Sequence, residues 1–388
     1  MIRRVTLWTK PTAMVSLHRS ARYGRRPMAN RRASESPLAF IRPAVRAMRG
    51  YTPGEQPQSG GYIKLNTNEN PYPPSALVGE AIRRCATDEV RLYPDPMANA
   101  LRDAAAARYD LTRDHVLAGN GSDELLAMVL RACVDAGDRV AYPCPTYSLY
   151  DTLVAIAGAT AVQLPFPDDF SLPAGLAAAD ARVTFVCNPN APSGTFVAVD
   201  ALALLAEQLA GLLVVDEAYV DFAGDSALRL VRERSNVVVL RTLSKSFSLA
   251  GLRVGLAFGP PPVIAELCKV KDSYNLSRVS IAAGAAALAD YGVMREHARR
   301  ICATRARLSE RLRGLGYTVP PSQANFVLAR GAGRDQRQVY EALKQRRILV
   351  RYFETPELRD ALRITVGTGN EIDALLAALE DICVKRET

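Results

Sequence analysis

Short runs of apolar residues, almost unbroken by polar ones, recur through the middle of this 388-residue chain. A strand with one face in water alternates polar and apolar residues, so unbroken runs predict strands covered on both faces, as in a parallel sheet. Segments with helical spacing of apolar residues lie between the runs, as at 122–135 and 200–209. We therefore expect successive βαβ units and an α/β fold with a mostly parallel sheet flanked by helices. The predicted strands are 139–143, 181–189, 211–219, 236–244 and 253–259.

The C-terminal part has a different pattern, in which shorter candidate strands lie between helices. An Ala-rich stretch predicts one long helix over 281–303, and Pro, Gly and Asn in 50–75 predict an extended segment rather than a helix. The later strands are expected at 324–330, 347–353 and 361–367, with helices at 335–346 and 370–384. The expected organisation is a basic extension (1–40), an N-terminal arm (41–76), a large domain (77–275) and a small α+β C-terminal domain (276–388).

The net charge of +9 is concentrated near the N-terminus. No acidic residue precedes Glu35, whereas nine Lys and Arg residues do, and the rest of the chain is close to neutral. Such a stretch can mark a nucleic-acid partner or a targeting segment, but it lacks an amphipathic apolar stripe. We expect a disordered extension, with Met28 as an alternative start, or else a targeting segment, and no nucleic-acid partner. The sequence has no uncharged apolar run of about 18 residues, so no membrane-spanning helix is predicted.

Cysteine and histidine usage disfavours several kinds of site. The seven cysteines are scattered, odd in number and without a C-x-x-C pair, so neither a disulfide framework nor a zinc site is indicated. Only three histidines occur, which leaves little material for a histidine-based triad or a metal centre. We expect a soluble protein without a metal, in a reducing cytoplasm.

An acidic residue, Asp216, directly follows the apolar run 212–215. Functional groups of open α/β sheets gather beyond the carboxyl ends of the strands. Burial penalises a charged carboxylate unless a cation compensates for it. The protonated pyridine nitrogen of a cofactor is one such cation, and a helix N-cap or a salt bridge is the alternative.

Lys245 stands among small residues where the next apolar run stops. Partial burial lowers the pKa of a lysine and makes the neutral, nucleophilic amine accessible, as Schiff-base chemistry requires. Ser244 and Arg253 add a hydroxyl and a guanidinium suited to a phosphate. Taken alone, the same lysine would be an ordinary surface residue.

A third cluster, G-N-G-S-D-E at 119–124, combines a glycine turn with the start of a helix. The free N–H groups and the dipole of a helix N-terminus favour an anion there. A simple capping turn would explain the motif equally well. Because the full G-x-G-x-x-G spacing is missing, a nicotinamide site is disfavoured.

Together these clusters resemble those of a known family. The motif T-L-S-K-S-F-S-L-A-G (242–251) resembles the lysine motif of fold-type I pyridoxal-phosphate aminotransferases and, among these, of the histidinol-phosphate aminotransferase family. The similarity covers about residues 40–385. It implies a seven-stranded sheet in the large domain, pyridoxal 5′-phosphate as cofactor, and a homodimer. The implied reaction moves an amino group between L-histidinol phosphate and 2-oxoglutarate, giving imidazole-acetol phosphate and glutamate in histidine biosynthesis.

The resemblance also assigns roles to individual residues. Lys245 would form the Schiff base and move the proton between the substrate α-carbon and cofactor C4′. Asp216 would hold the pyridine nitrogen, and Tyr219 the 3-oxygen. At the phosphate, the implied contacts are the backbone of Ser122 and Asp123 and the side chains of Ser244 and Arg253. Tyr147, in P-T-Y-S-L-Y (145–150), would stack on the ring. Tyr93, in R-L-Y-P-D-P (91–96), would reach across the dimer interface to the phosphate.

The chain departs from the family pattern at one position. Family members have an asparagine that contacts the 3-oxygen where this chain has Ala191, in N-P-N-A-P-S-G (188–194). Asn190 or Asn188 is expected to take over that contact.

For the substrate, the resemblance points to two arginines near the C-terminus. Arg363, in L-R-I-T-V-G-T (362–368), matches the arginine that binds the substrate in the family, since a planar guanidinium suits a bidentate carboxylate. Arg351 and Tyr51 match positions that help to hold the substrate phosphate. The residues that line the entrance in relatives are Asn66, Asn68, Glu69 and Asn70, of which Asn68 is expected to contact the substrate.

The sequence leaves other functions open. An aromatic-amino-acid aminotransferase and a threonine-phosphate decarboxylase use the same scaffold and cofactor. A non-catalytic regulator would carry a folded DNA-binding module before an aminotransferase-like domain, whereas only about 50 irregular residues precede it here.

Overall fold

A computed structural model of the chain describes residues 37–48, 50, 54–57, 60–331 and 333–384. Contacts divide the chain into two units, Met1–Arg46 and Ala47–Thr388. The described elements of the first unit are η1 (Pro37–Phe40) and α1 (Pro43–Ala47). The last residue of α1, Ala47, already belongs to the second unit. The predicted basic extension up to residue 36, with its alternative start at Met28, lies outside the described residues.

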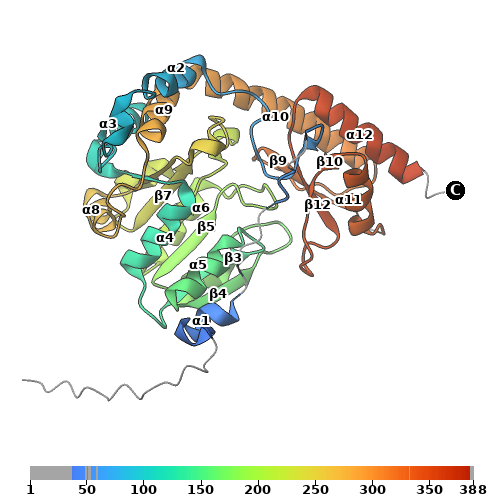
Figure 1. Cartoon of the computed structure of the whole chain (residues 1–388). Coiled ribbons are helices and arrows are strands. Elements are labelled where there is room, and N and C mark those ends of the chain that lie inside the picture. Colours follow the sequence, from blue (N-terminus) through green and yellow to red (C-terminus); the bar gives the residue numbers. More distant parts are fainter. Residues whose placement is uncertain (1–36, 49, 51–53, 58–59, 332, 385–388) are drawn as a thin grey trace, which may run out of the picture. The chain divides into compact units, whose positions relative to one another are not determined.

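A seven-stranded sheet forms the centre of the second unit (Figure 1). Six of its strands run in the same direction, whereas β8 is antiparallel to both of its neighbours, β2 and β7. This confirms the predicted α/β fold with a mostly parallel, seven-stranded sheet flanked by helices. In spatial order the strands are β2 (Val116–Gly119), β8 (Gly255–Phe258), β7 (Val237–Thr242), β6 (Leu212–Asp216), β5 (Val183–Cys187), β3 (Arg139–Cys144) and β4 (Thr160–Pro165).

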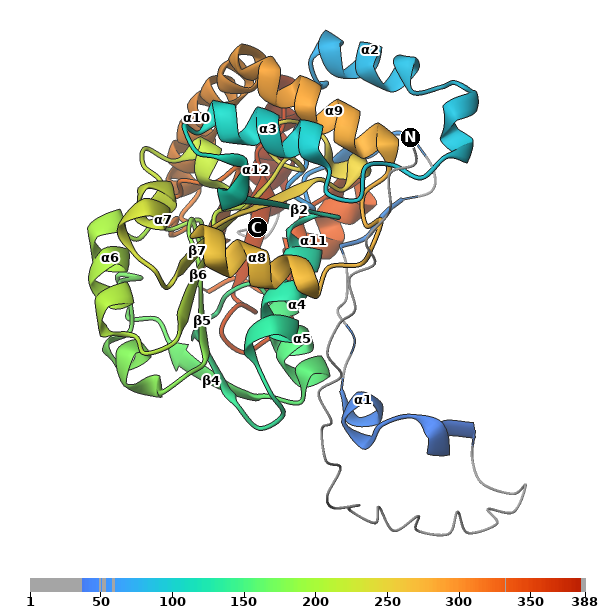
Figure 2. The same cartoon turned by 90° about the vertical axis from the view of Figure 1, so that its left-hand side faces the viewer.

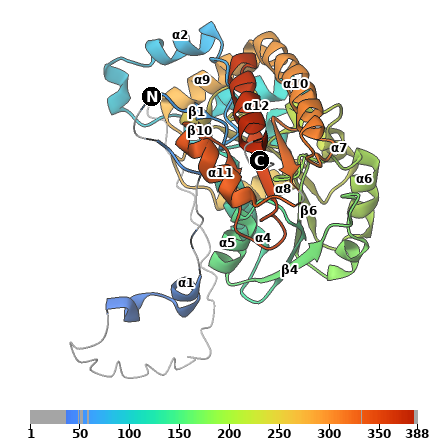
Figure 3. The same ribbon diagram turned by 90° about the vertical axis from the view of Figure 1, so that its right-hand side faces the viewer.

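The unbroken apolar runs correspond to the strands that helices cover on both faces. Strands β5, β6 and β7 are buried over almost their whole length. Helices α6 and α7 lie on one side of the sheet, and α4 and α5 on the other (Figures 2 and 3). The covering helices are α4 (Ser122–Cys133), α5 (Leu149–Ala157), α6 (Val199–Gln208), α7 (Leu230–Glu233) and α8 (Pro261–Lys269), with α2 (Ala76–Arg84) and α3 (Asn99–Arg108) packed against α9 (Arg278–Ala289).

Two strands of this sheet, β4 and β2, were not predicted. β4 is an edge strand whose residues alternate between exposed and half-buried, so it lacks the signature of a doubly covered strand. β2 is only four residues long and runs straight into the glycine turn after Gly119. Both strands owe their place to pairing with distant segments rather than to a local pattern.

The single Ala-rich helix predicted over 281–303 is wrong, because two helices meet there. Helix α9 ends at Ala289 and α10 (Tyr291–Gly314) begins after Asp290, whose ψ of 51° is not helical. Aspartate hydrogen-bonds to nearby backbone and favours helix ends over helix interiors, which accounts for the break. Helix α10 then leads to the C-terminal elements (Figure 1).

The single strand predicted over 347–353 is also wrong, because the segment changes partners at Val350. Its first part, β10 (Ile348–Leu349), pairs parallel with β1 (Ile63–Lys64) of the N-terminal arm. Its second part, β11 (Arg351–Tyr352), pairs antiparallel with β12 (Ala361–Thr365), which also pairs with β9 (Phe326–Arg330). The helices beside these strands are α11 (Gln336–Gln345) and α12 (Gly369–Val384), as predicted within one or two residues.

The strand directions bring the predicted site clusters to one edge of the sheet. The carboxyl ends of β2, β6 and β7 lie at the same edge, because β8 is antiparallel to both β2 and β7. For the same reason β8 begins at that edge, just after Arg253. No helix in the described part of the chain is both long and apolar enough to span a bilayer.

Candidate active site

A cavity of about 470 Å³ opens where the carboxyl edge of the large sheet faces β11 and β12. Its volume is in the range of small-molecule sites. Most of the predicted site residues line it, although they come from segments far apart in sequence. They are Asn68, Ser122, Asp123, Tyr147, Asp216, Tyr219, Ser244, Lys245, Arg253, Arg351 and Arg363.

Lys245 lies half-buried in the cavity wall, after the end of β7. Its Nζ donates a hydrogen bond of 3.3 Å to the carbonyl oxygen of Thr67 and lies 5.7 Å from the ring centre of Tyr219. Loss of solvation lowers the pKa of Lys245 to about 8, and the positive charge of Arg363 acts in the same direction. An appreciable fraction of the amine is therefore neutral near pH 8 and able to act as a nucleophile.

Asp216 is a buried acid, 2% exposed, at the carboxyl end of β6. Tyr150 donates a hydrogen bond of 3.0 Å to its Oδ2, and the N–H of Ala218 donates one of 3.2 Å to its Oδ1. Burial raises the pKa of Asp216 to about 6, against the effect of these two hydrogen bonds. Within the described residues no basic side chain forms an ion pair with it. The carboxylate thus fits a cation brought by a ligand.

A cradle for an anion lies between the start of α4 and the start of β8. Arg253 reaches it from a left-handed backbone (φ 52°), which places Nη1 3.2 Å from the Ser244 hydroxyl and Nη2 3.3 Å from Asp123. Glycines permit the close approach: Gly121 has φ 83°, and a Cβ on Gly255 would lie 2.4 Å from the backbone of Gly121. With the free N–H groups of the α4 N-terminus, these groups suit a phosphate.

The hydroxyl of Tyr219 lies at the back of the cavity. It accepts a hydrogen bond of 3.0 Å from Nδ2 of Asn68, and its ring packs edge-on against Phe326 at 5.0 Å. Burial raises the pKa of Tyr219 well above its ordinary value, although the charge of Arg363 and the Asn68 hydrogen bond oppose the rise. Tyr219 is therefore a neutral hydrogen-bonding group at physiological pH.

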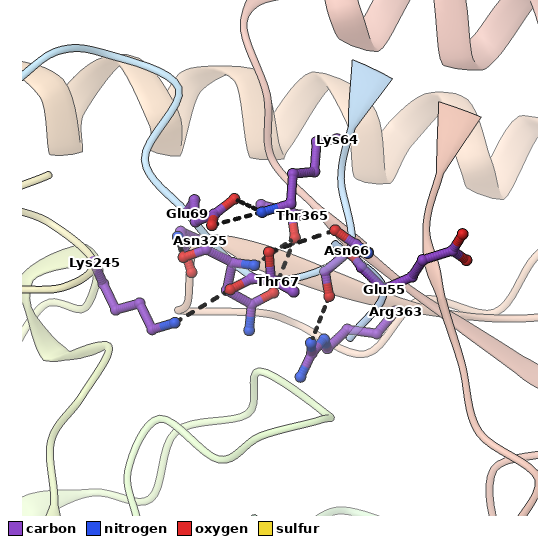
Figure 4. Close-up of polar contacts among 10 residues, drawn as sticks. Glu55, Lys64, Asn66, Thr67, Glu69, Lys245, Asn325, Arg363 and Thr365 are labelled. Carbon is purple, nitrogen blue, oxygen red and sulfur yellow. Dashed lines mark hydrogen bonds and ion pairs between the residues drawn. The ribbon is translucent and has the colours of Figure 1, made fainter. Parts of the chain in front are cut away.

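Residues 66–68, which we name the strap, touch three predicted functional side chains in turn. Figure 4 shows the first two contacts, of Asn66 with Arg363 and of Thr67 with Lys245. The carbonyl of Asn66 accepts from Nη2 of Arg363 at 3.0 Å, and that of Thr67 accepts from Lys245. Asn68 donates to Tyr219. The strap therefore connects the predicted cofactor-binding and substrate-binding groups.

Two arginines face the cavity from the C-terminal sheet. Arg351 and Arg363 are register partners on β11 and β12, so their side chains share one face. Their guanidinium carbons lie 5.3 Å and 5.6 Å from the ring centre of Phe353, which also lines the cavity. Two neighbouring guanidinium groups have the charge and the donors that suit a doubly charged anion.

The amides near Ala191 are turned away from the cavity. Asn190 donates from Nδ2 to the Pro145 carbonyl (3.1 Å) and the Ser193 hydroxyl (2.9 Å), and its Oδ1 accepts from Thr146 (2.7 Å). Asn188 uses its amide to bond both backbone groups of Val197. The wall at this point is formed by Ala191 and Pro192. Asn190 and Asn188 were expected to replace the usual asparagine. In the structure, the amides of both side chains already form hydrogen bonds with other protein groups.

Another predicted residue, Tyr93, does not line the cavity. Tyr93 is largely exposed and stacks on Tyr274, with ring centres 4.4 Å apart. Tyr51 lies outside the described residues.

Sequence reasoning missed several groups of the site. Tyr150 is buried against Phe185 and holds Asp216, yet its only sequence signal is the second tyrosine of P-T-Y-S-L-Y. The carbonyls of Asn66 and Thr67 act through the backbone, which no residue type reveals. Phe353 could have been found as the aromatic residue two positions after Arg351 on a strand, where alternate residues share a face.

Comparison with known proteins gives a consistent result. The sequence model of the family described as aminotransferase class I and II matches residues 61–379. Histidinol-phosphate aminotransferase 1 of Trichormus variabilis is 45% identical over 345 residues, which cover 88% of this chain and 99% of that protein. Histidinol-phosphate aminotransferase of Geotalea uraniireducens is 47% identical over 343 residues, with 88% and 99% covered.

Solved structures agree with the sequence comparison. Histidinol-phosphate aminotransferase from Sinorhizobium meliloti, in complex with pyridoxal-5′-phosphate, aligns with a TM-score of 0.82 at 27% identity and covers 90% of this chain and 99% of that chain. A mutant aspartate aminotransferase from Thermus thermophilus shares the fold, with a TM-score of 0.74 at 22% identity over 88% of this chain and 98% of that chain.

The architecture is that of the fold-type I aminotransferases, as the resemblance of the lysine motif implied. The chain belongs to the aminotransferase class I and II family and, within it, to the histidinol-phosphate aminotransferases.

Proposed function

We propose that the chain transfers an amino group between L-histidinol phosphate and 2-oxoglutarate, giving imidazole-acetol phosphate and glutamate in histidine biosynthesis, with pyridoxal 5′-phosphate as cofactor. The names and coverage of its relatives support this function. The observation that carries the choice of substrate is the pairing of Arg351 with Arg363 on one wall of the cavity. A phosphate ester supplies the dianion that two adjacent guanidinium groups favour.

The residues present fit the cofactor at each of its functional groups. The Arg253 cradle matches a phosphate, and a Cβ on Gly121 would lie 2.4 Å from Arg253 Nη2 and disturb it. Asp216 is a buried acid that lacks a basic partner among the described residues, so it matches a protonated pyridine nitrogen. Tyr147 lines the cavity and would cover the ring, and Lys245 is the amine that would hold the cofactor covalently.

When bound, pyridoxal phosphate supplies an electron sink for the pair released at the substrate carbon, which no side chain here can supply. The chain's own residues bind, orient and move the proton. Lys245 Nζ, with a pKa lowered to about 8, would take the proton from the carbon that bears the amine and return it. Asp216 would keep the pyridine nitrogen protonated, and the Tyr219 hydroxyl would bind the 3-oxygen.

Recognition of the substrate is assigned to the opposite wall of the cavity. Arg351 and Arg363 would bind the phosphate of L-histidinol phosphate and, in the second half of the exchange, a carboxylate of 2-oxoglutarate. Tyr51 would assist at the phosphate and Asn68 at the entrance. The charges of the two arginines would hold either anion beside Lys245, because Arg363 lies close enough to lower the pKa of that lysine.

We propose that the chain acts as a homodimer. Apolar and aromatic side chains are exposed around the segment after α2, where Tyr93 stacks on Tyr274. Exposed groups of this kind mark interaction surfaces. In the dimer, Tyr93 would reach the cofactor phosphate of the partner subunit. The exposed members of this surface are Leu77, Val90, Leu92, Tyr93 and Tyr274.

Organisation and location are proposed on the same basis. We propose a large cofactor-binding domain over 77–275, a small domain over 276–388, and a cytoplasmic enzyme. The six described cysteines are free thiols, which suits a reducing compartment.

A substrate panel tests the proposed function. Purified protein loaded with pyridoxal phosphate is mixed with single amino donors, and the visible absorbance of the cofactor is followed. L-Histidinol phosphate is expected to bleach it rapidly, with 2-oxoglutarate restoring it. Conversion by phenylalanine alone would indicate the aromatic aminotransferase, and release of CO2 from threonine phosphate would indicate the decarboxylase. A chain that responds to no donor, or whose Lys245→Ala variant keeps the same spectrum, would refute the assignment to this chemistry.

A further inference from the structure

Asn68 is the residue of the strap with the most hydrogen bonds to other segments. Its backbone N–H donates to Oγ1 of Thr365 (3.0 Å), and its carbonyl accepts from Nδ2 of Asn325 (2.9 Å). Its side chain contacts Thr365 and Tyr219. These bonds hold a residue that is 1% exposed and has a left-handed backbone (φ 57°).

The contact with Thr365 fixes which way the Asn68 amide points. The Thr365 hydroxyl accepts from the Asn68 N–H and donates its one hydrogen to Asn68 Oδ1, 3.0 Å away. The other end of the amide, Nδ2, must then face Tyr219, at 3.0 Å.

The direction of this bond determines what Tyr219 offers to the cavity. Because Asn68 has no hydrogen-bond acceptor at Nδ2, the phenolic oxygen is the acceptor. The hydrogen of Tyr219 is not used in that bond, and among the described residues the Tyr219 hydroxyl donates to no other group, so its hydrogen is available to a ligand in the cavity. Tyr219 is thus set as a donor toward a ligand oxygen.

The wall around Ala191 offers no amide donor for the same oxygen. Ala191 presents a methyl group, and the amides of Asn190 and Asn188 are bonded within their loop. A cofactor 3-oxygen bound near Tyr219 would therefore receive its hydrogen bond from the Tyr219 hydroxyl, and Asn68 determines the direction in which that hydroxyl donates.

We propose that Asn68 is a positioning residue that holds the Tyr219 hydroxyl as a donor to the cofactor 3-oxygen, and so compensates for the absence of an asparagine at position 191. The inference rests on the proposed function, since it requires the cofactor. Asparagine suits the place because it is one of the few residues that adopt the left-handed region at low cost while offering a donor and an acceptor.

The test measures the resting enzyme without substrate. A hydrogen bond to the 3-oxygen withdraws negative charge from it, so the proton held beside that oxygen leaves at a lower pH. Loss of the oriented donor should raise the pH midpoint of the cofactor's visible absorbance by about one unit, the size of one such hydrogen bond. Cofactor affinity, measured separately by equilibrium titration of the apoprotein, should fall roughly tenfold.

Two variants remove the bond in different ways. Asn68→Gly deletes the amide and keeps the left-handed backbone without strain. Asn68→Asp keeps the shape, but its carboxylate accepts the Tyr219 hydrogen and turns it away from the cavity, so its upward shift should be larger. Asn236→Ala is the matched control: its amide donates to the Ala206 carbonyl (2.9 Å), and Asn236 does not line the cavity. The control midpoint should stay within about 0.2 unit of the parent protein, a shift of about 0.3 kcal/mol.

Ala191→Asn in the Asn68→Gly background provides the rescue. An amide in the wall at 191 should move the midpoint back toward that of the parent protein. The inference is overturned if both Asn68 variants bind the cofactor and keep the parent midpoint, or if Asn236→Ala shifts it equally. If the parent protein itself binds no pyridoxal phosphate, the proposed function fails, a result distinct from an unchanged midpoint.

Discussion

Arg351 of β11 and Arg363 of β12 lie directly opposite each other in an antiparallel strand pair. Like charges in this position destabilise a sheet, so the pairing has a cost in the free protein. Both guanidinium groups lie over the ring of Phe353 and face the cavity. An anion bound between them would relieve their repulsion, which connects this sheet to substrate binding.

Arg351→Gln should therefore discriminate between classes of substrate. We expect kcat/KM for L-histidinol phosphate to fall roughly 10- to 100-fold, since one charge-assisted hydrogen bond contributes about 1.5–3 kcal/mol. The value for phenylalanine, which has no phosphate, should change less than about threefold. Steady-state kinetics with both donors measure the difference. Arg337→Gln is the control, because Arg337 forms a surface ion pair with Glu354 outside the cavity. Equal losses for both donors would contradict the assignment of Arg351 to the phosphate.

The pKa of Lys245 should respond to the charges around it. It is lowered to about 8 by burial and by Arg363, and Glu69 acts in the opposite direction. A nearby cation disfavours the ammonium form, so Arg363→Gln should move the pKa upward, and Glu69→Gln should move it downward. The pH dependence of the rate at which the apoprotein reacts with pyridoxal gives the midpoint. Shifts of the same sign in both variants would show that these charges do not act on Lys245.

Much of the fold and the cofactor side of the site could be predicted from sequence because the signals are local. The apolar runs before Asp216 and Lys245 mark doubly covered strands, and the glycine turn at 119–124 marks a helix start. Their meeting at one sheet edge follows from parallel strands. The break at Asp290 was missed because residues compatible with a helix continue on both sides of it.

The substrate side could not be predicted in the same way, because it depends on register and on distant pairing. Thr67 and Lys245 are 178 positions apart, and their contact uses a backbone carbonyl that every residue type has. The opposition of Arg351 and Arg363 depends on the alignment of two short strands. The direction of the Asn190 amide depends on neighbours such as Thr146, 44 positions away.

The surface around Tyr93 should form the interface between two copies of the chain. Leu92→Asp places a charge among exposed apolar groups and should convert the dimer to monomers, as measured by sedimentation velocity. Leu204→Asp is the control, since Leu204 is exposed on α6, away from these residues in sequence. Tyr93→Phe should leave the dimer intact and weaken cofactor binding, if its hydroxyl reaches the phosphate. A chain that sediments as a monomer without any substitution would contradict the proposed dimer.

Asp216→Asn should stabilise the apoprotein at the same time as it removes activity. The pKa of Asp216 is raised from 3.8 to about 6 by burial, so the folded state binds the proton more tightly than the unfolded state. The resulting stabilisation is complete below about pH 4 and is lost as the pH rises through 6. At pH 8 the buried carboxylate costs up to about 3 kcal/mol, so the variant should unfold at higher urea concentration there. Activity should fall about a hundredfold or more, because the cofactor loses its electrostatic partner.

Tyr150→Phe should have the opposite effect on the apoprotein. It removes the 3.0 Å hydrogen bond to Asp216 without changing the acid itself, so the carboxylate loses a donor. We expect the free energy of unfolding at pH 8 to fall by about 1.5–3 kcal/mol, the range for a hydrogen bond to a charged group. The loss should be smaller at pH 5, where Asp216 is mostly protonated and its carboxyl no longer needs the same donor. Urea unfolding of both variants and the parent protein at pH 5 and pH 8 measures these free-energy differences. If each variant differs from the parent protein by the same free energy at both pH values, Asp216 is not a buried charged group.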